Sequence, residues 1–351
     1  MTRTATGQSS FLRTLRGQAT SPPPIWLMRQ AGRYLPEYRA TRTKAGGFLD
    51  LCYAPELAAE VTLQPIRRYG FDAAILFADI LIVPDALGQD IRFVEGEGPR
   101  LDPIRSAADL LRLRPEATRP KFARIAETVA RLVQDLPRET ALIGFCGAPW
   151  TVATYMVEGG GSKDHAETRL WAYRDAAGFQ QLIDILVEAS IEYLSGQVEA
   201  GADALQIFDT WAGSLAEDEF ERWVVAPTAR MVLELRRRHP GIPIIGFPRG
   251  VGVKALAYVA STGVDGIGCD TGVPVEFMSN VLGPHTIVQG NLDPLLLVAG
   301  GSAMERRVEY IIESMRGRHR FIFNLGHGIV PETPPENVAR LVELVRAGVA
   351  S

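Results

Sequence analysis

The sequence predicts an α/β fold, a single-domain (β/α)8 barrel of the TIM type. Three observations lead to this prediction: apolar runs alternate with amphipathic segments, there are eight such runs, and no linker divides them. A strand followed by a helix, repeated eight times, is the pattern of a closed parallel barrel. The runner-up is an open doubly wound sheet, and it is disfavoured because no GxGxxG follows the first run.

The predicted strands are short and nearly continuous in apolar residues, as strands buried on both faces are. They cover residues 24–30, 73–79, 141–147, 204–210, 242–248, 264–270, 286–292 and 320–326. The predicted helices cover residues 54–70, 121–136, 179–201, 218–239, 252–262, 274–283, 294–317 and 334–348. Residues 83–117 predict an extra loop or hairpin after the second strand, a candidate lid or interface element.

We expect residues 1–351 to form one domain, in which residues 1–20 are an N-terminal extension with a short helix. That extension lacks acidic residues, as a transit peptide does, but FLRTLRG followed by three prolines favours an uncleaved helix. The formal net charge of −4 disfavours nucleic acid as a partner. No apolar run reaches the roughly 18 residues of a membrane span.

The chain contains three cysteines, Cys52, Cys146 and Cys269, which are far apart and form no CxxC pair. Such sparse cysteines favour a reducing compartment and disfavour a disulfide framework or a structural zinc site. We therefore expect a cytoplasmic protein.

Polar residues follow the predicted strands at the ends from which a barrel of this type builds its site. In strand order they are Arg29, Gln30 and Arg33; Asp79; Tyr155; Asp209 and Thr210; Arg249; Asp270; Asn291 and Asp293; and His327. A plainer interpretation exists for Thr210, Asp270 and Asp293, because each stands where a helix could begin and could cap it. For His327, which lies between two glycines, we favour a functional role.

The stretch MRQAGRY, residues 28–34, raises the question of which anion its two arginines meet. An arginine at the end of a buried strand is costly unless an anion lies beside it. One candidate is structural, because Asp79 follows a neighbouring apolar run and could pair with Arg29 or Arg33. The other candidate is an anionic ligand. For Tyr155, ordinary packing is the alternative to a role in the site.

Five stretches are similar to motifs of the uroporphyrinogen decarboxylase family. PIWLMRQAGRYLPEYR and GFCGAPWTVATYMVEGGGSKDH resemble its two signature stretches, and QIFDTWAG, QGNLDP and FNLGHGIVPETPPENV resemble further blocks in the same order. The resemblance implies a (β/α)8 enzyme that works as a homodimer and without a cofactor. Such enzymes remove the four acetate carboxyls of uroporphyrinogen III as CO2 and produce coproporphyrinogen III for haem synthesis.

The resemblance also implies roles for individual residues, with no metal ligand among them. Arg29 and Arg33 correspond to arginines that meet substrate carboxylates, and Gln30, Ala31 and Gly32 of the same motif are expected to bind substrate. Asp79 corresponds to an aspartate that binds the pyrrole NH groups, Tyr155 to a tyrosine near the reacting acetate, Thr210 to a contact with a side-chain carboxylate, and His327 to a histidine at the propionates. The expected catalytic residues are Asp79, Arg29 and Tyr155.

Two stretches depart from the family pattern. GIGCDTG has Cys269 and Thr271 where leucine and tryptophan are expected, and FPRG has Arg249 where lysine is more usual. The expected core set is intact, but the pattern assigns no role to Thr271.

The residue types suit this chemistry. Guanidiniums bind carboxylate oxygens in pairs, and the implied substrate carries eight carboxylates. Protonation of the pyrrole ring creates a cationic electron sink, so that CO2 leaves without the cofactor that such a step otherwise needs. An anionic Asp79 would bind the cationic intermediate more tightly than the substrate. The proton donor stays open between Arg29, Tyr155, His327 and water, because an arginine is a poor acid.

Two other functions stay open. A corrinoid-linked methyltransferase on the same barrel would need a zinc site with a His-x-Cys pair and a later cysteine, and the sequence contains no such pair. A tetrapyrrole-binding protein without turnover would show the same ring of binding residues, but it would not require both Asp79 and Tyr155.

Overall fold

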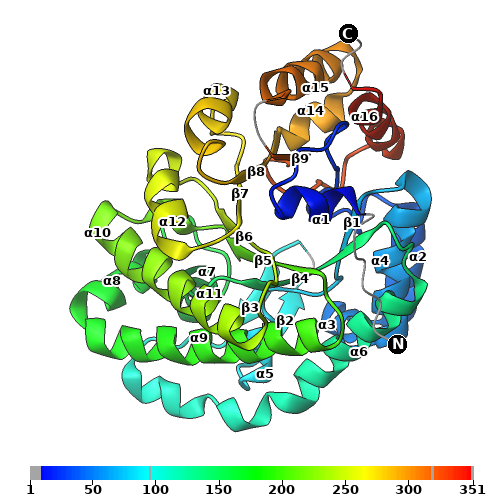
Figure 1. The fold of residues 1–351 in the computed structure, drawn as a ribbon. Coiled ribbons are helices and arrows are strands. Elements are labelled where there is room, and N and C mark those ends of the chain that lie inside the picture. Colours follow the sequence, from blue (N-terminus) through cyan, green and yellow to red (C-terminus); the bar gives the residue numbers. More distant parts are fainter. Residues whose placement is uncertain (1–8, 95, 318–319, 349–351) are drawn as a thin grey trace.

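Seven parallel strands lie in the middle of the molecule and helices surround them, in a computed structural model that describes residues 9–94, 96–317 and 320–348 (Figure 1). The strands pair in the order β1-β4-β5-β6-β7-β8-β9. Their bounds are β1 Ala73–Ile75, β4 Ala141–Gly147, β5 Ala204–Asp209, β6 Ile244–Pro248, β7 Gly266–Gly268, β8 Ile287–Leu292 and β9 Phe321–Leu325. All seven fall inside predicted strands, and the curled parallel sheet with its helices confirms the TIM-type α/β class.

The backbone around Ile25 links the two ends of this sheet. Ile25 forms an isolated parallel bridge with Phe323 of β9, and the Pro24 carbonyl accepts a hydrogen bond from the Phe323 N–H at 2.8 Å. On the other side, the Ile25 carbonyl accepts from the N–H of Asp72, just before β1, at 2.9 Å. The segment thus takes the eighth position of the barrel.

The prediction of a full strand over residues 24–30 is nevertheless wrong beyond this bridge. The chain already turns there, since the Gln30 N–H donates to the Leu27 carbonyl at 3.0 Å. A turn uses the backbone groups that a longer ladder with the neighbouring strands would need. Sequence reasoning missed it because the run is apolar almost to its end.

The helices cover the outside of the sheet (Figure 1). Their bounds are α1 Ser10–Leu15, α2 Pro36–Ala45, α3 Phe48–Cys52, α4 Pro55–Tyr69, α5 Ile82–Ala86, α6 Arg119–Asp135, α7 Pro149–Glu158, α8 Ala166–Arg174, α9 Ala176–Glu199, α10 Glu217–Phe220, α11 Ala226–Arg238, α12 Ala255–Thr262, α13 Val275–Phe277, α14 Pro294–Ala299, α15 Gly301–Met315 and α16 Pro335–Ala347. None of the described helices combines the length and the apolar composition that a membrane span requires.

The helix predictions differ from the structure in several places. The segment 294–317 is two helices, because Gly300 takes a φ of 63° that ends α14. The segment 218–239 contains a π-helical turn over Glu221–Val225, just before a proline that cannot donate a backbone hydrogen bond. Helix α7 was not predicted, because Pro149 was interpreted as part of a Gly-Ala-Pro turn, whereas it is the first residue of the helix.

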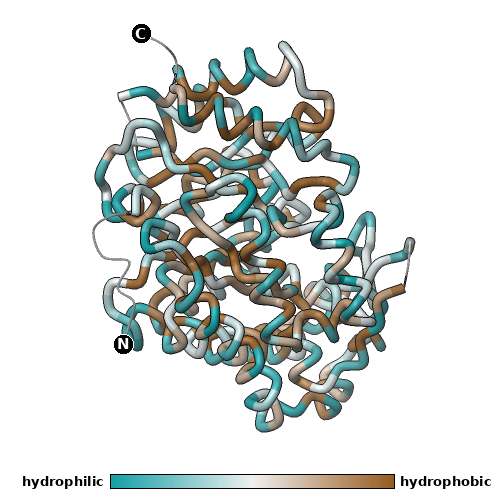
Figure 2. Tube along the Cα trace, turned by 90° about the vertical axis from the view of Figure 1, so that its right-hand side faces the viewer, coloured by the Kyte–Doolittle hydropathy of each residue, from teal (hydrophilic) through white to brown (hydrophobic). Residues whose placement is uncertain are grey.

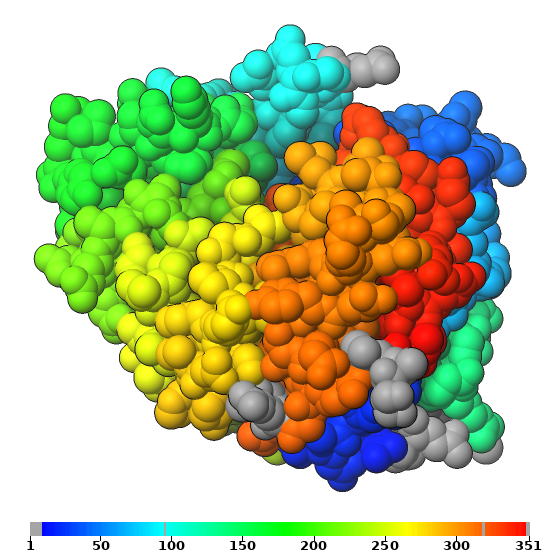
Figure 3. Space-filling model, turned by 90° about the horizontal axis from the view of Figure 1, so that it is seen from above, coloured from blue at the N-terminus to red at the C-terminus, as the bar shows by residue number. Residues whose placement is uncertain are grey.

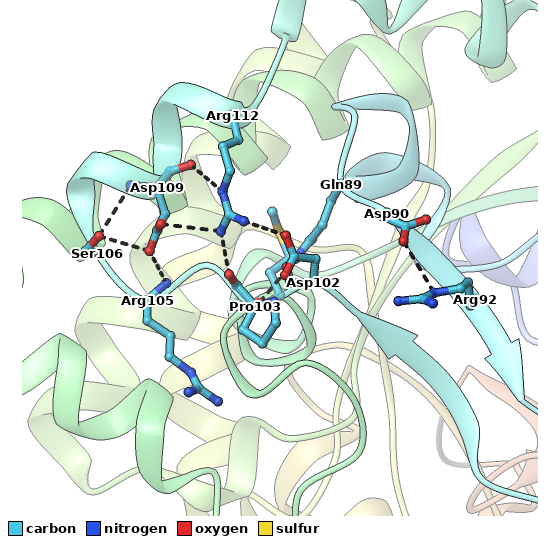
Figure 4. A network of polar contacts seen from close by, with 10 residues as sticks. Gln89, Asp90, Arg92, Asp102, Pro103, Arg105, Ser106, Asp109 and Arg112 are labelled. Carbon is cyan, nitrogen blue, oxygen red and sulfur yellow. Dashed lines mark hydrogen bonds and ion pairs between the residues drawn. The ribbon is translucent and has the colours of Figure 1, made fainter.

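The expected hairpin after the second predicted strand exists as β2 (Ile91–Val94) and β3 (Gly98–Leu101), which pair antiparallel. It projects at the rim in the space-filling view (cyan in Figure 3). The following loop is held by the Arg112 guanidinium, which binds Asp102 and the Pro103 carbonyl, each at 2.5 Å, and by Asp109, which accepts from Ser106 (Figure 4).

This excursion is also bonded to the end of α7. The Leu101 N–H donates to the Gly159 carbonyl at 3.0 Å, and the Ile104 N–H donates to the Met156 carbonyl at 2.9 Å. The hairpin is therefore fixed to the helix that carries Tyr155.

Apolar residues concentrate inside the molecule and hydrophilic residues outside it (Figure 2). The buried apolar side chains belong to one continuous core that runs from α1 to α16. A short polar chain crosses the interior: Trp26 Nε1 donates to Gln289 Oε1 at 2.8 Å, and Gln289 Nε2 donates to Gln206 Oε1 at 3.2 Å. Such paired polar groups fix one arrangement of the barrel interior beneath the strand ends.

Candidate active site

Arg29 lies on a turn whose backbone is held on both sides. Its φ of 60° is in the left-handed region, which is uncommon for a residue with a side chain. The Met28 N–H donates to Asn324 Oδ1 at 3.0 Å, and the Met28 carbonyl accepts from the Ile329 N–H at 2.9 Å. Strain of this kind persists where surrounding contacts determine the conformation, and it concentrates at functional sites. The side chain of Arg29 is exposed.

Gln30 supports this turn from inside. Its side chain is fully buried, with Oε1 accepting from the Leu27 N–H at 3.1 Å and Nε2 donating to the Ala73 carbonyl at 3.2 Å. Its own carbonyl accepts from the Tyr34 hydroxyl at 2.9 Å. The polar groups of Gln30 thus already have partners within the protein, and its contact with a substrate stays a prediction.

Ala31 and Gly32 are half-buried in the same loop, and Arg33 is exposed. The charge of Arg33 acts on the pKa of Tyr38, which it lowers against the dominant effect of burial. The structure therefore links Arg33 to Tyr38 and shows no corresponding link to Asp79 in the described part of the chain.

Asp79 is half-buried in the loop after β1. Its Oδ1 accepts from the Leu81 N–H at 2.9 Å. Burial raises the pKa of Asp79, while the Leu81 N–H and the charge of Arg29 lower it. Among the described residues no ion pair joins Asp79 to Arg29 or Arg33. The structural pair is thus not formed, and both guanidiniums remain available to another anion.

Tyr155 lies on α7, one helical turn after Thr151, and is half-buried. Burial raises the pKa of its phenol, the charge of Asp79 raises it further, and the charge of Arg29 lowers it. The phenol therefore stays protonated at neutral pH. Because these charges act on Tyr155 and on each other, Arg29, Asp79 and Tyr155 lie close together.

His327 follows β9, half-buried, with its ring stacked on Phe247 at 6.3 Å between centroids and 12° between planes. Burial and the charges of Arg29 and Arg249 lower the pKa of His327 to about 4, against the opposing charge of Asp270. The imidazole is therefore neutral at pH 7. Its Nδ1 is buried and has no hydrogen-bond partner among the residues that the structure describes.

The glycines on either side of His327 are needed for space. A Cβ added to Gly328 would lie 2.4 Å from Cδ of Arg29, and one added to Gly326 would lie 2.4 Å from the backbone nitrogen of Thr271. Real Cβ atoms do not come so close to other heavy atoms. Gly328 therefore provides the room in which the Arg29 side chain lies.

The plainer interpretation, a helix cap, is confirmed for Asp293 and is wrong for Asp270. Asp270 accepts from the Gly250 N–H at 2.6 Å and from the Gly272 N–H at 2.7 Å, so it ties together the loops after β6 and β7. Asp293 caps α14 by accepting from the Leu295 N–H at 2.8 Å. Thr210 makes no such cap in the described structure.

Thr210 is half-buried at the end of β5, next to Trp211. The Trp211 ring lies 4.2 Å from the Tyr155 ring and 4.7 Å from the His165 ring. Sequence reasoning missed both Trp211 and His165 as parts of the candidate site. Adjacency to Thr210 was a signal for Trp211, whereas the contact of His165 depends on the fold of the glycine-rich loop after α7.

Among the described residues no group of three or more His, Cys, Asp or Glu side chains is arranged to hold a metal ion. The three cysteines are buried and unpaired.

Comparison with known proteins agrees with the motifs in this site. The family profile described as Uroporphyrinogen decarboxylase (URO-D) matches residues 6–348. A curated protein from Rhodospirillum rubrum named uroporphyrinogen decarboxylase is 57% identical over 340 residues, 97% of each chain. The chain belongs to the uroporphyrinogen decarboxylase family.

Further relatives have the same name. A protein from Rhizorhabdus wittichii is 57% identical over 96% of this chain and 97% of its own length, and one from Sinorhizobium fredii is 56% identical over 95% and 96%. Among solved structures, a methyltransferase from Methanosarcina mazei has a TM-score of 0.75 at 20% identity, covering 97% of this chain and 98% of its own. At that identity the likeness shows the shared fold alone.

Proposed function

We propose that this protein is a uroporphyrinogen decarboxylase, a carboxy-lyase that needs no cofactor. It would remove the four acetate carboxyls of uroporphyrinogen III as CO2 and yield coproporphyrinogen III for haem biosynthesis. The observation that carries the proposal is the family membership, with 57% identity over 97% of a relative of that name. The site supports it independently, because the guanidinium of Arg29, which forms no ion pair among the described residues, acts on the half-buried Asp79.

Arg29 and Arg33 are proposed to bind substrate carboxylates. Each charged hydrogen bond contributes roughly 1.5–3 kcal/mol net, so a few of them offset the desolvation of the acetate and propionate arms. The left-handed turn at Arg29 holds its guanidinium over the reacting acetate in this proposal. Gln30, Ala31 and Gly32 shape the loop, and Thr210 contacts a further carboxylate.

Asp79 is proposed to stabilise the cation that forms when the pyrrole ring carbon is protonated. Burial disfavours the carboxylate in the free protein, as the raised pKa of Asp79 indicates. A neighbouring pyrrole cation removes that disadvantage, so Asp79 interacts more strongly with the intermediate than with the neutral substrate. An interaction of that kind lowers the barrier itself.

Tyr155 and His327 are proposed to bind the substrate in their uncharged forms. The protonated phenol of Tyr155 donates a hydrogen bond to the reacting acetate, and the uncharged His327 binds a propionate by a hydrogen bond. For the proton that reaches the ring we propose that Arg29 positions the acetate and assists delivery, with water, Tyr155 and His327 as the alternative donors.

The direct test is incubation with uroporphyrinogen III under anaerobic, reducing conditions without added metal. We expect CO2 and coproporphyrinogen III in a ratio of four to one. Product only after addition of zinc or cobalamin would contradict the proposal and favour a corrinoid-linked methyltransferase. Tight binding of the tetrapyrrole without CO2 release would instead favour a binding protein without turnover.

We also propose a cytoplasmic homodimer in which residues 1–351 form one catalytic domain. Three buried free thiols suit a reducing compartment, and the continuous core from α1 to α16 suits a single domain. Neither nucleic acid nor a membrane is a proposed partner. Sedimentation equilibrium of the purified chain tests the dimer, with a purely monomeric mass as the contradicting result.

A further inference from the structure

One buried hydroxyl connects the end of β5 to the first turn of α7. Thr151 Oγ1 donates to Asp209 Oδ1 at 2.5 Å and accepts from the Trp211 N–H at 3.1 Å. Asp209, the last residue of β5, is only 1% exposed, and Thr151 is fully buried. Three residues from two separate elements thus share one hydrogen-bonded chain.

The same chain ends at the ring beside Tyr155. Besides its N–H, the Trp211 carbonyl is held, since it accepts from Trp150 Nε1 at 3.1 Å and from Ser214 Oγ at 2.8 Å. The Trp211 ring then lies on the Tyr155 ring at 4.2 Å with 36° between planes. Tyr155 stands four residues after Thr151, on the same face of α7.

Asp209 decides where the single proton of Thr151 points. A helical threonine hydroxyl otherwise tends to donate to a carbonyl of the preceding turn. When Asp209 is ionised, its carboxylate is a stronger acceptor than a carbonyl and fixes the proton on its own side. The lone pairs of Thr151 Oγ1 are then free to accept the Trp211 N–H.

The buried position of Asp209 is unfavourable for its carboxylate. Its Oδ2 is buried and accepts no hydrogen bond from the described residues. Burial raises the pKa of Asp209 to about 7, although the Thr151 hydroxyl lowers it. Packing does not account for such a group, whereas functional sites often contain one.

We propose that Asp209 is a positioning residue that acts through Thr151 and Trp211 to orient the Tyr155 phenol at the reacting acetate. The inference rests on the proposed function for the role of Tyr155 in turnover. Asp209 itself does not touch the substrate in this scheme.

The test uses the full chain with three substitutions on α7. Thr151→Val removes the hydroxyl at nearly constant shape, Thr151→Ser keeps it, and Thr154→Val is the matched control. Thr154 is equally buried on α7, but its hydroxyl donates to the Trp150 carbonyl at 2.8 Å. We expect Thr151→Val to lower kcat about tenfold with KM within about twofold, because it removes orientation rather than binding. Thr151→Ser should restore most of that loss, and Thr154→Val should keep kcat.

A double-mutant cycle separates positioning from general damage. In the Tyr155→Phe background, Thr151→Val should lower kcat by less than about twofold further, because coupled residues act non-additively. An equal loss in both backgrounds, or a Thr151→Ser variant as slow as Thr151→Val, would overturn the proposal. If Thr151→Val does not fold, Asp209→Asn replaces it in the same cycle, since it weakens the acceptor and keeps the shape.

Fluorescence tests whether Thr151 positions the Trp211 ring, and this measurement does not require turnover. The emission of Trp211 is obtained as the difference between the chain and its Trp211→Phe variant. We expect a lower anisotropy of this component in Thr151→Val than in Thr151→Ser, and equal values would overturn the proposal. A wild-type protein that releases no CO2 would contradict the proposed function instead, while this measurement still decides the positioning.

Discussion

Gly328→Ala is expected to slow turnover by displacing Arg29 while the fold stays intact. The added Cβ would lie 2.4 Å from Cδ and 2.7 Å from Cγ of Arg29. Ordinary carbon contacts need about 3.5–4.0 Å, so the side chain must move by at least about 1 Å. A misplacement of about 1 Å in a positioning group can cost about 100-fold in rate. At about 1.36 kcal/mol per tenfold, that is about 2.7 kcal/mol of barrier.

The stability of the fold should change little, because the clash is with the middle of one exposed side chain and not with backbone. Alanine in place of glycine even stabilises by about 0.4–1 kcal/mol where the backbone allows it. Gly326→Ala gives the contrast: its Cβ would meet the backbone nitrogen of Thr271 at 2.4 Å, and backbone cannot move aside. We expect Gly326→Ala to lose about 1–3 kcal/mol of stability through overpacking.

The assay pairs kcat/KM for coproporphyrinogen formation with thermal unfolding followed by circular dichroism. Gly196→Ala on α9 is the control, because a Cβ there meets nothing within 4 Å. It should raise stability by about 0.5–1 kcal/mol and leave turnover unchanged. A normal kcat/KM for Gly328→Ala would refute the reasoning. An equally large effect of Gly328→Ala in an Arg29→Ala background would refute it too, since the two changes should not be additive.

Three further predictions concern ionisable groups. Asp79→Asn should lower kcat by about 100–1000-fold with no loss of Tm, because it removes a desolvated charge that only the cationic intermediate compensates. The control variant Asp293→Asn, at a helix cap, should keep kcat. Near-normal turnover of Asp79→Asn would remove Asp79 from the mechanism. The pKa of His327, about 4 in the folded state, lies below the value of about 6.5 for an unfolded chain, so its contribution to stability is lost as pH falls from 6.5 towards 4. His327→Asn should lessen that loss of Tm and raise KM more than it lowers kcat, and an unchanged KM would argue against a propionate contact. Burial raises the pKa of Asp209 to about 7, so the free energy of unfolding falls by up to about 4 kcal/mol as pH rises from about 4 to 7. Asp209→Asn should flatten this dependence. Identical Tm profiles of the wild type and Asp209→Asn from pH 5 to 8 would contradict the prediction.

The strands were the most predictable part of the fold. All seven residues of β4, Ala141–Gly147, are buried, and the apolar run predicted the same bounds. A strand buried on both faces leaves that continuous pattern in the sequence itself. The segment 24–30 has the same pattern and yet bends after Ile25, because its hydrogen bonds are decided by Asn324 and Ile329, far along the chain.

The candidate site could be predicted from the sequence to the extent that its residues stand in compact motifs. Arg29, Tyr155 and His327 each lie in a stretch that resembles a family motif, and Asp79 was assigned by its match to a family aspartate. In the structure the charge of Arg29 lowers the pKa of Asp79, of Tyr155 and of His327. Arg33 lies in the same motif as Arg29, but its charge acts on Tyr38. Closeness in the sequence therefore did not reveal that the side chains of Arg29 and Arg33 lie near different groups.

The sequence by itself determined the fold class, the family and the chemical types in the site, because these depend on local apolar patterns and contiguous motifs. Only the tertiary structure decided which groups have partners. It leaves Arg29 without a carboxylate partner in the described chain, makes His327 neutral by burial and neighbouring cations, and gives Gly328 the role of leaving room for Arg29. The physical reason is that desolvation and steric contact depend on distances between distant segments, and no single stretch of sequence contains those distances.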